Sequence, residues 1–188
     1  MIQLRNKHAN LASARHSRPH QTQVRFQSAA ERWFLELCRL RNYMTHQLVW
    51  SNSVDEAHLE LRFQVLRVGM PRGSEHYPDV DNDIRTKFLC AYVGEQMVGC
   101  ATLQEDSRDG CKYRIRGMAV ATEYRNLGIG SDIVKTLQEK AKQEMTGIWC
   151  NARIRAVPMY ARCGFEIVSD IFDIENIGPH YDMEWKIE

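Results

Sequence analysis

The sequence lacks a long uninterrupted apolar run, and no segment reaches the roughly 20 residues that a membrane-spanning helix needs. It also lacks excess charge of either sign, because 25 Lys and Arg balance 24 Asp and Glu to a formal net charge of +1. A charge this balanced gives no global attraction to nucleic acid or to a membrane, although local patches remain open. We therefore expect a soluble protein with neither nucleic acid nor membrane as partner.

No two cysteines form a Cys-x-x-Cys pair, and the six are scattered, at positions 38, 90, 100, 111, 150 and 163. Most of them fall inside apolar segments that resemble strands. This distribution is typical of buried reduced thiols and favours neither a disulfide framework nor a zinc site. The sequence therefore predicts no metal and a reducing compartment, the cytoplasm.

Acidic residues are absent from residues 1–27, which carry five Lys or Arg and three His. Such a start is typical of a mitochondrial targeting segment or of a flexible basic tail, and the tail is the favoured interpretation. Ser28 and Glu31 then have the spacing of a capping box, and apolar residues recur at helical intervals behind them. We expect an additional N-terminal helix over 28–44 at the start of a single domain, 28–188.

After residue 45, apolar residues alternate between strand-like and helix-like spacing. A short strand over 46–52 precedes a helix that Asp55 caps. The apolar residues of that helix predict a buried stripe that ends before Pro71 and consists of Leu59, Phe63, Leu66 and Met70. Residues 71–86 predict a long irregular loop, which is typical either of a binding element or of a solvated charge run.

From residue 87 the spacing becomes that of strands, and three antiparallel strands are predicted over 88–93, 97–103 and 111–120. A helix then leads to a strand over 147–151, which should lie parallel to the strand over 111–120 because a crossover helix joins them. Two closing strands follow, over 165–174 and 181–187. The pattern predicts an α+β fold in three layers, with helices flanking a mixed, mostly antiparallel sheet of six or seven strands.

The loop Arg-Asn-Leu-Gly-Ile-Gly, residues 125–130, joins a strand to a helix that is predicted to start near Ser131. Glycines allow the backbone to approach a ligand closely, and the free N–H groups of a helix start attract phosphate. Arg125 adds a charge that suits a phosphate group. The loop therefore predicts an anion cradle, with a ligand-free turn as the alternative.

Two familiar phosphate-binding loops do not fit this cradle. A P-loop needs Lys followed by Ser or Thr after its last glycine, but Ser131 and Asp132 follow here. A dinucleotide-binding loop needs a third glycine, and Ile133 occupies that place. The cradle must therefore belong to another class.

Arg-x-x-Gly-x-Gly after a strand that ends in Met118-Ala119-Val120 resembles the pyrophosphate-binding motif of the GNAT superfamily of N-acetyltransferases, which bind acetyl-coenzyme A. Residues 151–165 resemble the segment of that superfamily in which an Asn ends a strand, a short helix carries a Tyr, and Gly-Phe begins the next strand. The resemblance covers about residues 45–188. It implies a GNAT-like fold in which the parallel strands 111–120 and 147–151 splay apart around the coenzyme.

The resemblance also implies which residues hold acetyl-coenzyme A, the expected co-substrate. The backbone of Met118, Ala119 and Val120 would pair with the pantetheine arm and polarise the acetyl carbonyl, while Asn151 would hold the arm from the other side. The pyrophosphate would lie on the loop and the helix start, that is, on Arg125, Asn126, Leu127, Gly128, Ile129, Gly130 and Ser131.

Two residues are predicted to be catalytic. Tyr160 matches the tyrosine that gives a proton to the coenzyme A thiolate in many relatives, and a phenol is a neutral donor at pH 7; core packing is the alternative. Many relatives place a glutamate base in the strand that here carries Arg114, Arg116 and Gly117. His180 is therefore the candidate base. A water chain, or an amine that arrives neutral, would need no base.

The implied activity is transfer of an acetyl group to a primary amine, with a non-catalytic coenzyme A binding or sensing module as the alternative. The acceptor is expected to be a small-molecule or peptide amine. A cationic amine would fit the acidic residues Glu75, Asp79, Asp81, Asp83, Asp170 and Asp173, but fold kinship does not fix the substrate. The N-terminal helix can pack on its own sheet or on a second chain, so a homodimer stays open.

Overall fold

The computed structural model describes residues 45–187 of the chain. All of them lie within one compact unit that extends from Leu40 to Glu188. The predicted tail over 1–27 and the predicted helix over 28–44 lie outside the described residues. No helix in the described part is both long enough and apolar enough to cross a membrane.

A mixed sheet forms the centre of the fold, with strand order β1-β2-β3-β4-β5-β8-β6 and with β7 paired to β8. Every pairing is antiparallel except that of β4 with β5, so the predicted α+β class and the predicted parallel pair are confirmed. The strands are β1 Gln47–Ser51, β2 Lys87–Val93, β3 Gln96–Arg108, β4 Cys111–Val120, β5 Gly147–Arg153, β6 Glu166–Ile167, β7 Phe172–Ile174 and β8 Gly178–Trp185.

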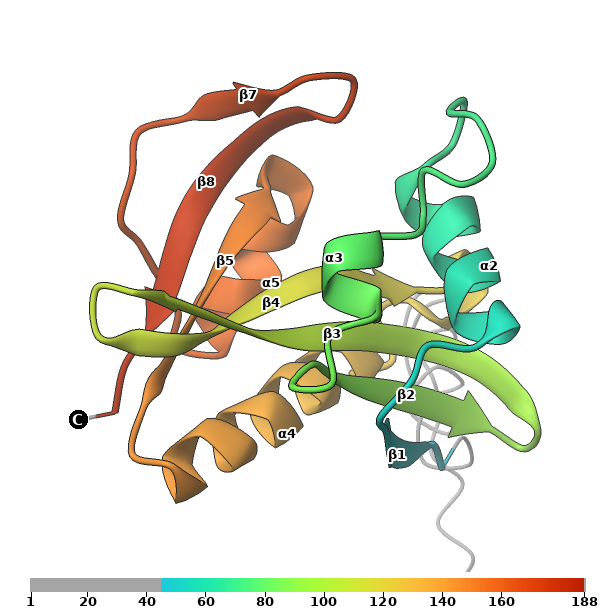
Figure 1. The fold of residues 1–188 in the computed structure, drawn as a ribbon, viewed down its shortest axis with the longest axis horizontal. Coiled ribbons are helices and arrows are strands. Elements are labelled where there is room, and N and C mark those ends of the chain that lie inside the picture. The colour runs from blue at the N-terminus through green and yellow to red at the C-terminus, as the bar shows by residue number, and fades with distance from the viewer. Residues whose placement is uncertain (1–44, 188) are drawn as a thin grey trace, which may run out of the picture. The chain divides into compact units, whose positions relative to one another are not determined.

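Helices cover both faces of this sheet (Figure 1). The α-helices are α2 Glu56–Leu66, α3 Pro78–Asp81, α4 Ile129–Gln143 and α5 Val157–Arg162, and the short 3₁₀ helices are η1 Thr122–Tyr124 and η2 Ile154–Ala156. The larger apolar core lies between the sheet and α4, whose predicted apolar residues Ile133, Val134, Leu137 and Ala141 are all buried. A smaller core lies on the opposite face, against α2.

The structure divides the closing segment that the sequence predicts as one strand over 165–174. Strands β6 and β7 flank residues 168–171. The N–H of Val168 still donates to Asp182 O at 2.9 Å, but the N–H of Asp182 donates to Ser169 Oγ at 2.9 Å, and strand pairing with β8 resumes only at Phe172. The described part of the sheet therefore has eight strands rather than six or seven. Strand β3 also runs further than predicted, to a turn in which Asp109 and Gly110 have positive φ.

Helix α2 begins as predicted, because the Asp55 carboxylate accepts the N–H of His58 at 2.8 Å. Its predicted buried stripe is wrong. The buried residues are His58, Leu61 and Arg62, whereas the predicted apolar residues within the helix are only half-buried and Met70 lies beyond its end. The reason is an ion pair: Arg62 turns inward to meet Asp81, which the predicted loop over 71–86 carries in the short helix α3.

Candidate active site

The gap between β4 and β5 is the centre of the site. The two strands pair only from Cys111 opposite Gly147 to Ile115 opposite Cys150. Beyond that point β4 stays with β3 and β5 stays with β8, and the two strands diverge (Figure 1). The predicted splay of the parallel pair is therefore present, and the edge of β4 after Ile115 has no strand beside it among the described residues.

A β-bulge at Gly117 shapes this edge. Thr102 of β3 lies opposite Arg116, but Cys100 lies opposite Ala119, so β4 contains one extra residue. Gly117 has a φ of +52°, and a Cβ there would lie 2.7 Å from Arg62 Nε, so only glycine fits. The sequence analysis missed the bulge, although a glycine inside a strand pattern is a signal for one.

The bulge also decides which groups face the gap. One extra residue reverses the alternation of side chains, so Met118 and Val120 pack on the α4 side and Ala119 on the α2 side. The N–H of Ala121 donates to Val98 O at 2.9 Å, and backbone groups alternate along a strand. The N–H and C=O groups of Met118 and Val120 therefore point away from β3, into the gap.

The predicted cradle lies at the end of β4. Gly128 is the N-cap of α4 with a φ of +93°, and Asn126 also has a positive φ, of 63°. The first backbone bond at this end of the helix joins the N–H of Asp132 to Gly128 O at 3.0 Å. The N–H groups of Ile129 and Gly130 thus have no intrahelical acceptor. The helix starts two residues before the predicted Ser131, which moves the free donors closer to β4.

The gap and the cradle open into one cavity of about 780 Å³. Both predicted catalytic residues line it, as do all the predicted coenzyme-binding residues except Leu127: Met118, Ala119, Val120, Arg125, Asn126, Gly128, Ile129, Gly130, Ser131 and Asn151. The structure thus brings together residues that lie far apart in the sequence.

Tyr160 is buried on α5, and its hydroxyl lies 3.4 Å from Met118 Sδ. Its ring meets Phe165 edge-on, with the ring centroids 5.3 Å apart. Burial, together with the neighbouring Cys150, raises the pKa of Tyr160 well above the usual value of 10. The phenol is therefore neutral and keeps its proton. A thioether is a weak acceptor, so this proton remains available to a better acceptor in the cavity.

His180 is buried on β8, opposite Arg153 of β5. Its Nδ1 lies 2.7 Å from Gly178 O, which assigns the proton to Nδ1 and leaves Nε2 with a free lone pair. Burial lowers the pKa of His180 and Arg153 lowers it further, while the bond to Gly178 opposes both effects. The imidazole is therefore neutral at pH 7, the form that accepts a proton.

Asn151 lines the cavity, but its side chain is held by other side chains. Its Oδ1 accepts from Arg114 and its Nδ2 donates to Asp182. The two partners are themselves ion-paired: Arg114 lies 2.9 Å from an oxygen of Asp106, and Asp182 lies 2.6 Å from Arg108. The amide of Asn151 is thus part of a charge-balanced network on the α2 side of the sheet.

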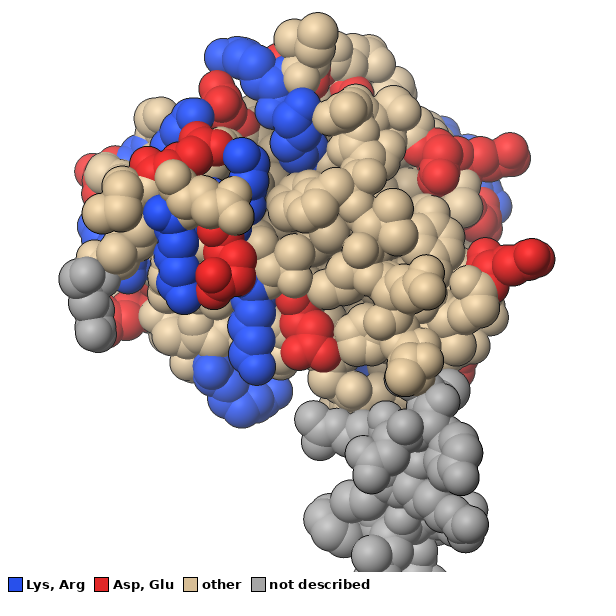
Figure 2. All heavy atoms as spheres, turned by 90° about the horizontal axis from the view of Figure 1, so that it is seen from below, with Lys and Arg blue, Asp and Glu red and all other residues tan. Residues whose placement is uncertain are grey.

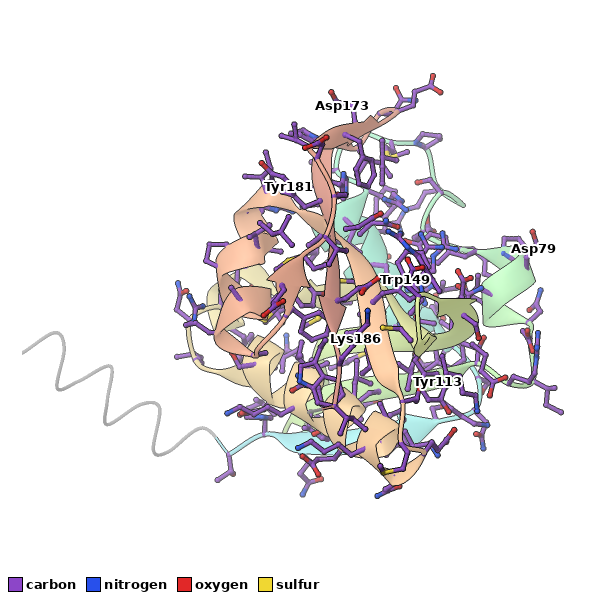
Figure 3. The ribbon with its side chains drawn as sticks, turned by 90° about the vertical axis from the view of Figure 1, so that its left-hand side faces the viewer. Asp79, Tyr113, Trp149, Asp173, Tyr181 and Lys186 are labelled. Carbon is purple, nitrogen blue, oxygen red and sulfur yellow. The ribbon has the colours of Figure 1, made fainter. Side chains whose placement is uncertain are left out.

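Trp149, near the centre of Figure 3, packs against this network. The guanidinium carbons of Arg108 and Arg114 lie 4.8 Å and 4.2 Å from the centroid of its ring. Its indole N–H donates to Asp106 O at 2.7 Å. The network is therefore braced by aromatic stacking, and it fixes the floor of the cavity next to β5.

The acidic residues that the sequence analysis assigned to a cationic acceptor do not line the cavity. Asp81 is buried against Arg62, and Asp83 pairs with the exposed Arg85. Figure 3 places Asp79, on α3, and Asp173, on β7, at the outer margins of the molecule. The cavity instead contains residues that the sequence analysis did not assign, among them Arg67, Tyr77, Arg153 and Arg155.

Known proteins are similar to this chain in sequence or in fold. An N-acetyltransferase of Bacillus subtilis (strain 168), YitI, whose function is uncharacterised, is 29% identical over 136 residues, which cover 70% of this chain and 90% of YitI. An acyl-CoA N-acyltransferase from Pseudomonas aeruginosa superimposes with a TM-score of 0.61 at 20% identity, covering 74% of this chain and 99% of that one. A Bacillus subtilis acetyltransferase solved in complex with CoA superimposes with a TM-score of 0.58 at 17% identity, covering 77% of this chain and 100% of that one.

These similarities identify the class of the protein as the acyltransferases. The family model described as "Acetyltransferase (GNAT) family" matches residues 53–165, which include the splayed strands, the cradle and Tyr160. The chain therefore belongs to the GNAT acetyltransferase family, and the resemblance stated from the sequence is confirmed.

Proposed function

We propose that the protein transfers an acetyl group from acetyl-coenzyme A to a primary amine by direct attack of the amine on the thioester. One observation carries the proposal: the glycine cradle, the open edge of β4 and the buried phenol of Tyr160 all line one cavity. An anion site alone would not need the open strand edge or the phenol. Membership of the GNAT family supports the same reading.

The residues present fit the coenzyme. The orphaned N–H groups at the start of α4 and the guanidinium of Arg125 suit a pyrophosphate. A Cβ at Gly130 would make only an ordinary contact with Met118 Cε, at 3.5 Å, so the packing of the chain does not require glycine there, whereas close approach of a ligand to the backbone would favour it. The gap-facing groups of Met118 and Val120 suit the amide-bearing pantetheine arm. When bound, the coenzyme supplies the acetyl thioester.

Three groups of the chain then perform the transfer. An N–H at the edge of β4 stabilises the negative charge that develops on the carbonyl oxygen. As the C–N bond forms and the C–S bond breaks, the amine gives up one proton, for which Nε2 of His180 is the acceptor. The hydroxyl of Tyr160 gives its proton to the departing sulfur. As the products leave, the phenolate regains a proton from solvent and His180 releases the one it accepted, so the net transfer is from the amine to the thiolate. Asn151 contributes by holding the polar network that forms the cavity floor.

Changing the cradle should weaken coenzyme binding. In an Arg125→Ala, Gly128→Ala double variant, the first change removes a charged donor and the second forces alanine to a φ of +93°. We expect the dissociation constant for acetyl-coenzyme A, measured by isothermal titration calorimetry, to rise about 10- to 100-fold. Arg85→Ala, at an exposed arginine outside the cavity, is the matched control and should bind as the wild type does. Equal affinity of the double variant would refute the cradle.

The role of His180 predicts a specific pH profile. Protonation occupies Nε2, and because burial lowers the pKa of His180, this protonation requires a pH lower than an ordinary imidazole would need. We expect kcat/KM to rise with pH through this ionisation and to rise again as the amine itself deprotonates. In His180→Gln the lower ionisation should disappear and kcat/KM at pH 7.5 should fall about 100-fold or more. If the fall in kcat/KM at low pH persists in the variant, that fall reports the ionisation of another group.

A further inference from the structure

The cavity is lined by seven arginines and by no Asp or Glu among the described residues: Arg67, Arg114, Arg116, Arg125, Arg153, Arg155 and Arg162. The chain as a whole is nearly neutral. Figure 2 shows a face on which basic and acidic side chains lie next to one another. Ion pairs such as Lys140 with Glu144 and Lys142 with Glu139 likewise mix the two signs on α4. The concentration of positive side chains without acidic ones is therefore a property of the cavity.

The coenzyme and the polar network account for some of these arginines. Arg125 belongs to the cradle. Arg162 is the last residue of α5, and the next residue, Cys163, contacts Ser131 at the start of α4. Arg162 therefore also lies near the phosphate site. Arg114 is paired with Asp106. Arg155 is exposed at the rim, which leaves the half-buried Arg67, Arg116 and Arg153, the arginine cluster.

The arginine cluster has no carboxylate partner in the part of the chain that the structure describes. Arg153 donates to Leu66 O at 2.7 Å, and Arg67 donates to Ser74 O at 2.9 Å and to the Tyr77 hydroxyl at 2.8 Å. Arg116 has neither a hydrogen bond nor an ion pair within the described residues, and its guanidinium lies over the ring of Tyr77. Since a guanidinium carries five N–H donors, most of the donors in the cluster are unused.

Helix capping explains only part of this arrangement. Leu66 is the last residue of α2, so Arg67 and Arg153 lie at its negative end and satisfy carbonyls there. Arg116 comes from β4 and contacts only the face of Tyr77, with its guanidinium carbon 5.2 Å from the ring centroid. Burial and then Arg114 lower the pKa of Arg116, against smaller opposing effects of Tyr77 and Asp106, and burial with Arg155 and Arg67 lowers that of Arg153. A bound anion would relieve this repulsion.

Resting on the proposed function, we propose that the amine acceptor also carries an oxyanion, a carboxylate or a phosphate, which binds to Arg116 with Arg67 and Arg153. Arg153 lies directly opposite His180 in the sheet, so the oxyanion site adjoins the proposed base. Guanidinium groups match both oxyanions through paired N–H donors. A purely cationic amine would instead meet three unpaired positive charges on this side of the cavity.

Matched amine pairs test the acceptor class. β-Alanine with β-alaninamide reports a carboxylate, and glucosamine 6-phosphate with glucosamine reports a phosphate, with kcat/KM measured from the release of free thiol. We expect at least one anionic member to exceed its neutral partner 10-fold or more. Arg116→Gln should abolish that preference without weakening acetyl-coenzyme A binding, and Arg116→Lys should restore part of it. Arg72→Gln, at an exposed arginine outside the cavity, should leave the preference intact.

The outcomes separate this inference from acetyl transfer itself. If neutral and anionic amines turn over equally, the acceptor class is wrong while the proposed function stands. If no amine turns over, the coenzyme A-saturated protein is titrated with inorganic phosphate. Phosphate binding that Arg116→Gln abolishes, and Arg72→Gln does not, would support the oxyanion site although acetyl transfer had failed. No phosphate binding in that experiment would overturn the inference.

Discussion

Replacing Arg62 with methionine should lower the free energy of unfolding by about 3–5 kcal/mol, because it leaves the carboxylate of Asp81 buried without its partner. Both side chains are completely buried, and Arg62 Nη1 lies 2.8 Å from the nearer oxygen of Asp81. Arg62 also donates to Glu75 O at 3.2 Å and to the Thr102 hydroxyl. One guanidinium thus joins α2, the segment before α3, and β3. Urea unfolding followed by circular dichroism measures the change.

A double variant separates the lost ion pair from lost packing. Arg62→Met together with Asp81→Leu removes both charges, and replacing a buried ion pair with apolar residues is often close to neutral. We expect the double variant to recover most of the stability that the single variant loses. Arg72→Met breaks the exposed pair with Glu60 and should change stability little. A double variant no more stable than Arg62→Met would show that packing, and not charge, carries the effect.

The same ion pair links stability to the site. Arg62 lies directly behind the bulge, where it fills the space that a Cβ at Gly117 would need. Its guanidinium also lies 4.7 Å from the ring of Tyr77, which lines the cavity. The bulge that directs the backbone N–H and C=O groups of Met118 and Val120 into the gap therefore packs against a buried charged side chain. Loss of Arg62 should consequently disturb acetyl-coenzyme A binding as well as the fold.

Local signals in the sequence predict the larger part of this fold. Strand β4 has its predicted bounds, α4 buries its predicted stripe, and Asp55 caps α2. These features depend on residues close together in the chain, where apolar spacing and capping chemistry act directly. The cradle is predictable for the same reason, because a strand, a glycine loop and a helix start follow one another without interruption. The structure places that cradle on the cavity.

The features that the sequence does not predict depend on contacts between distant residues. Spacing in α2 favours Leu59 and Phe63 for burial, but the partner in α3 draws Arg62 inward instead. The arginine cluster likewise comes from the end of α2, from β4 and from β5, and nothing in those local sequences indicates that the three side chains line one cavity. The acidic residues within 71–86 and 170–173 predict a cationic acceptor for the same reason, because the sequence does not show their partners, such as Arg62 for Asp81.

Replacing Tyr160 with phenylalanine should lower kcat about 100-fold or more, the range in which a positioned proton donor contributes, while acetyl-coenzyme A still binds. The substitution keeps the ring and its edge-on contact with Phe165. It removes a hydroxyl whose contacts within the described chain are weak ones with two sulfur atoms, Met118 Sδ and the Cys150 thiol. Stability should therefore change little, so lost turnover cannot be attributed to unfolding. Free-thiol release measures kcat, and calorimetry measures coenzyme binding.

The raised pKa of Tyr160 sharpens this prediction. A phenol that ionises only well above pH 10 keeps its proton across the working range, so it should produce no fall in rate at basic pH. The burial that makes it a weaker acid also raises the pKa of the neighbouring Cys150 thiol, and a departing thiolate in the same surroundings becomes a stronger base. The pKa of the proton donor and the pKa of the departing thiol are therefore raised together. Tyr92→Phe, at a tyrosine outside the cavity, is the control. If the kcat of Tyr160→Phe lies within threefold of the kcat of Tyr92→Phe, Tyr160 is a packing residue and not a proton donor.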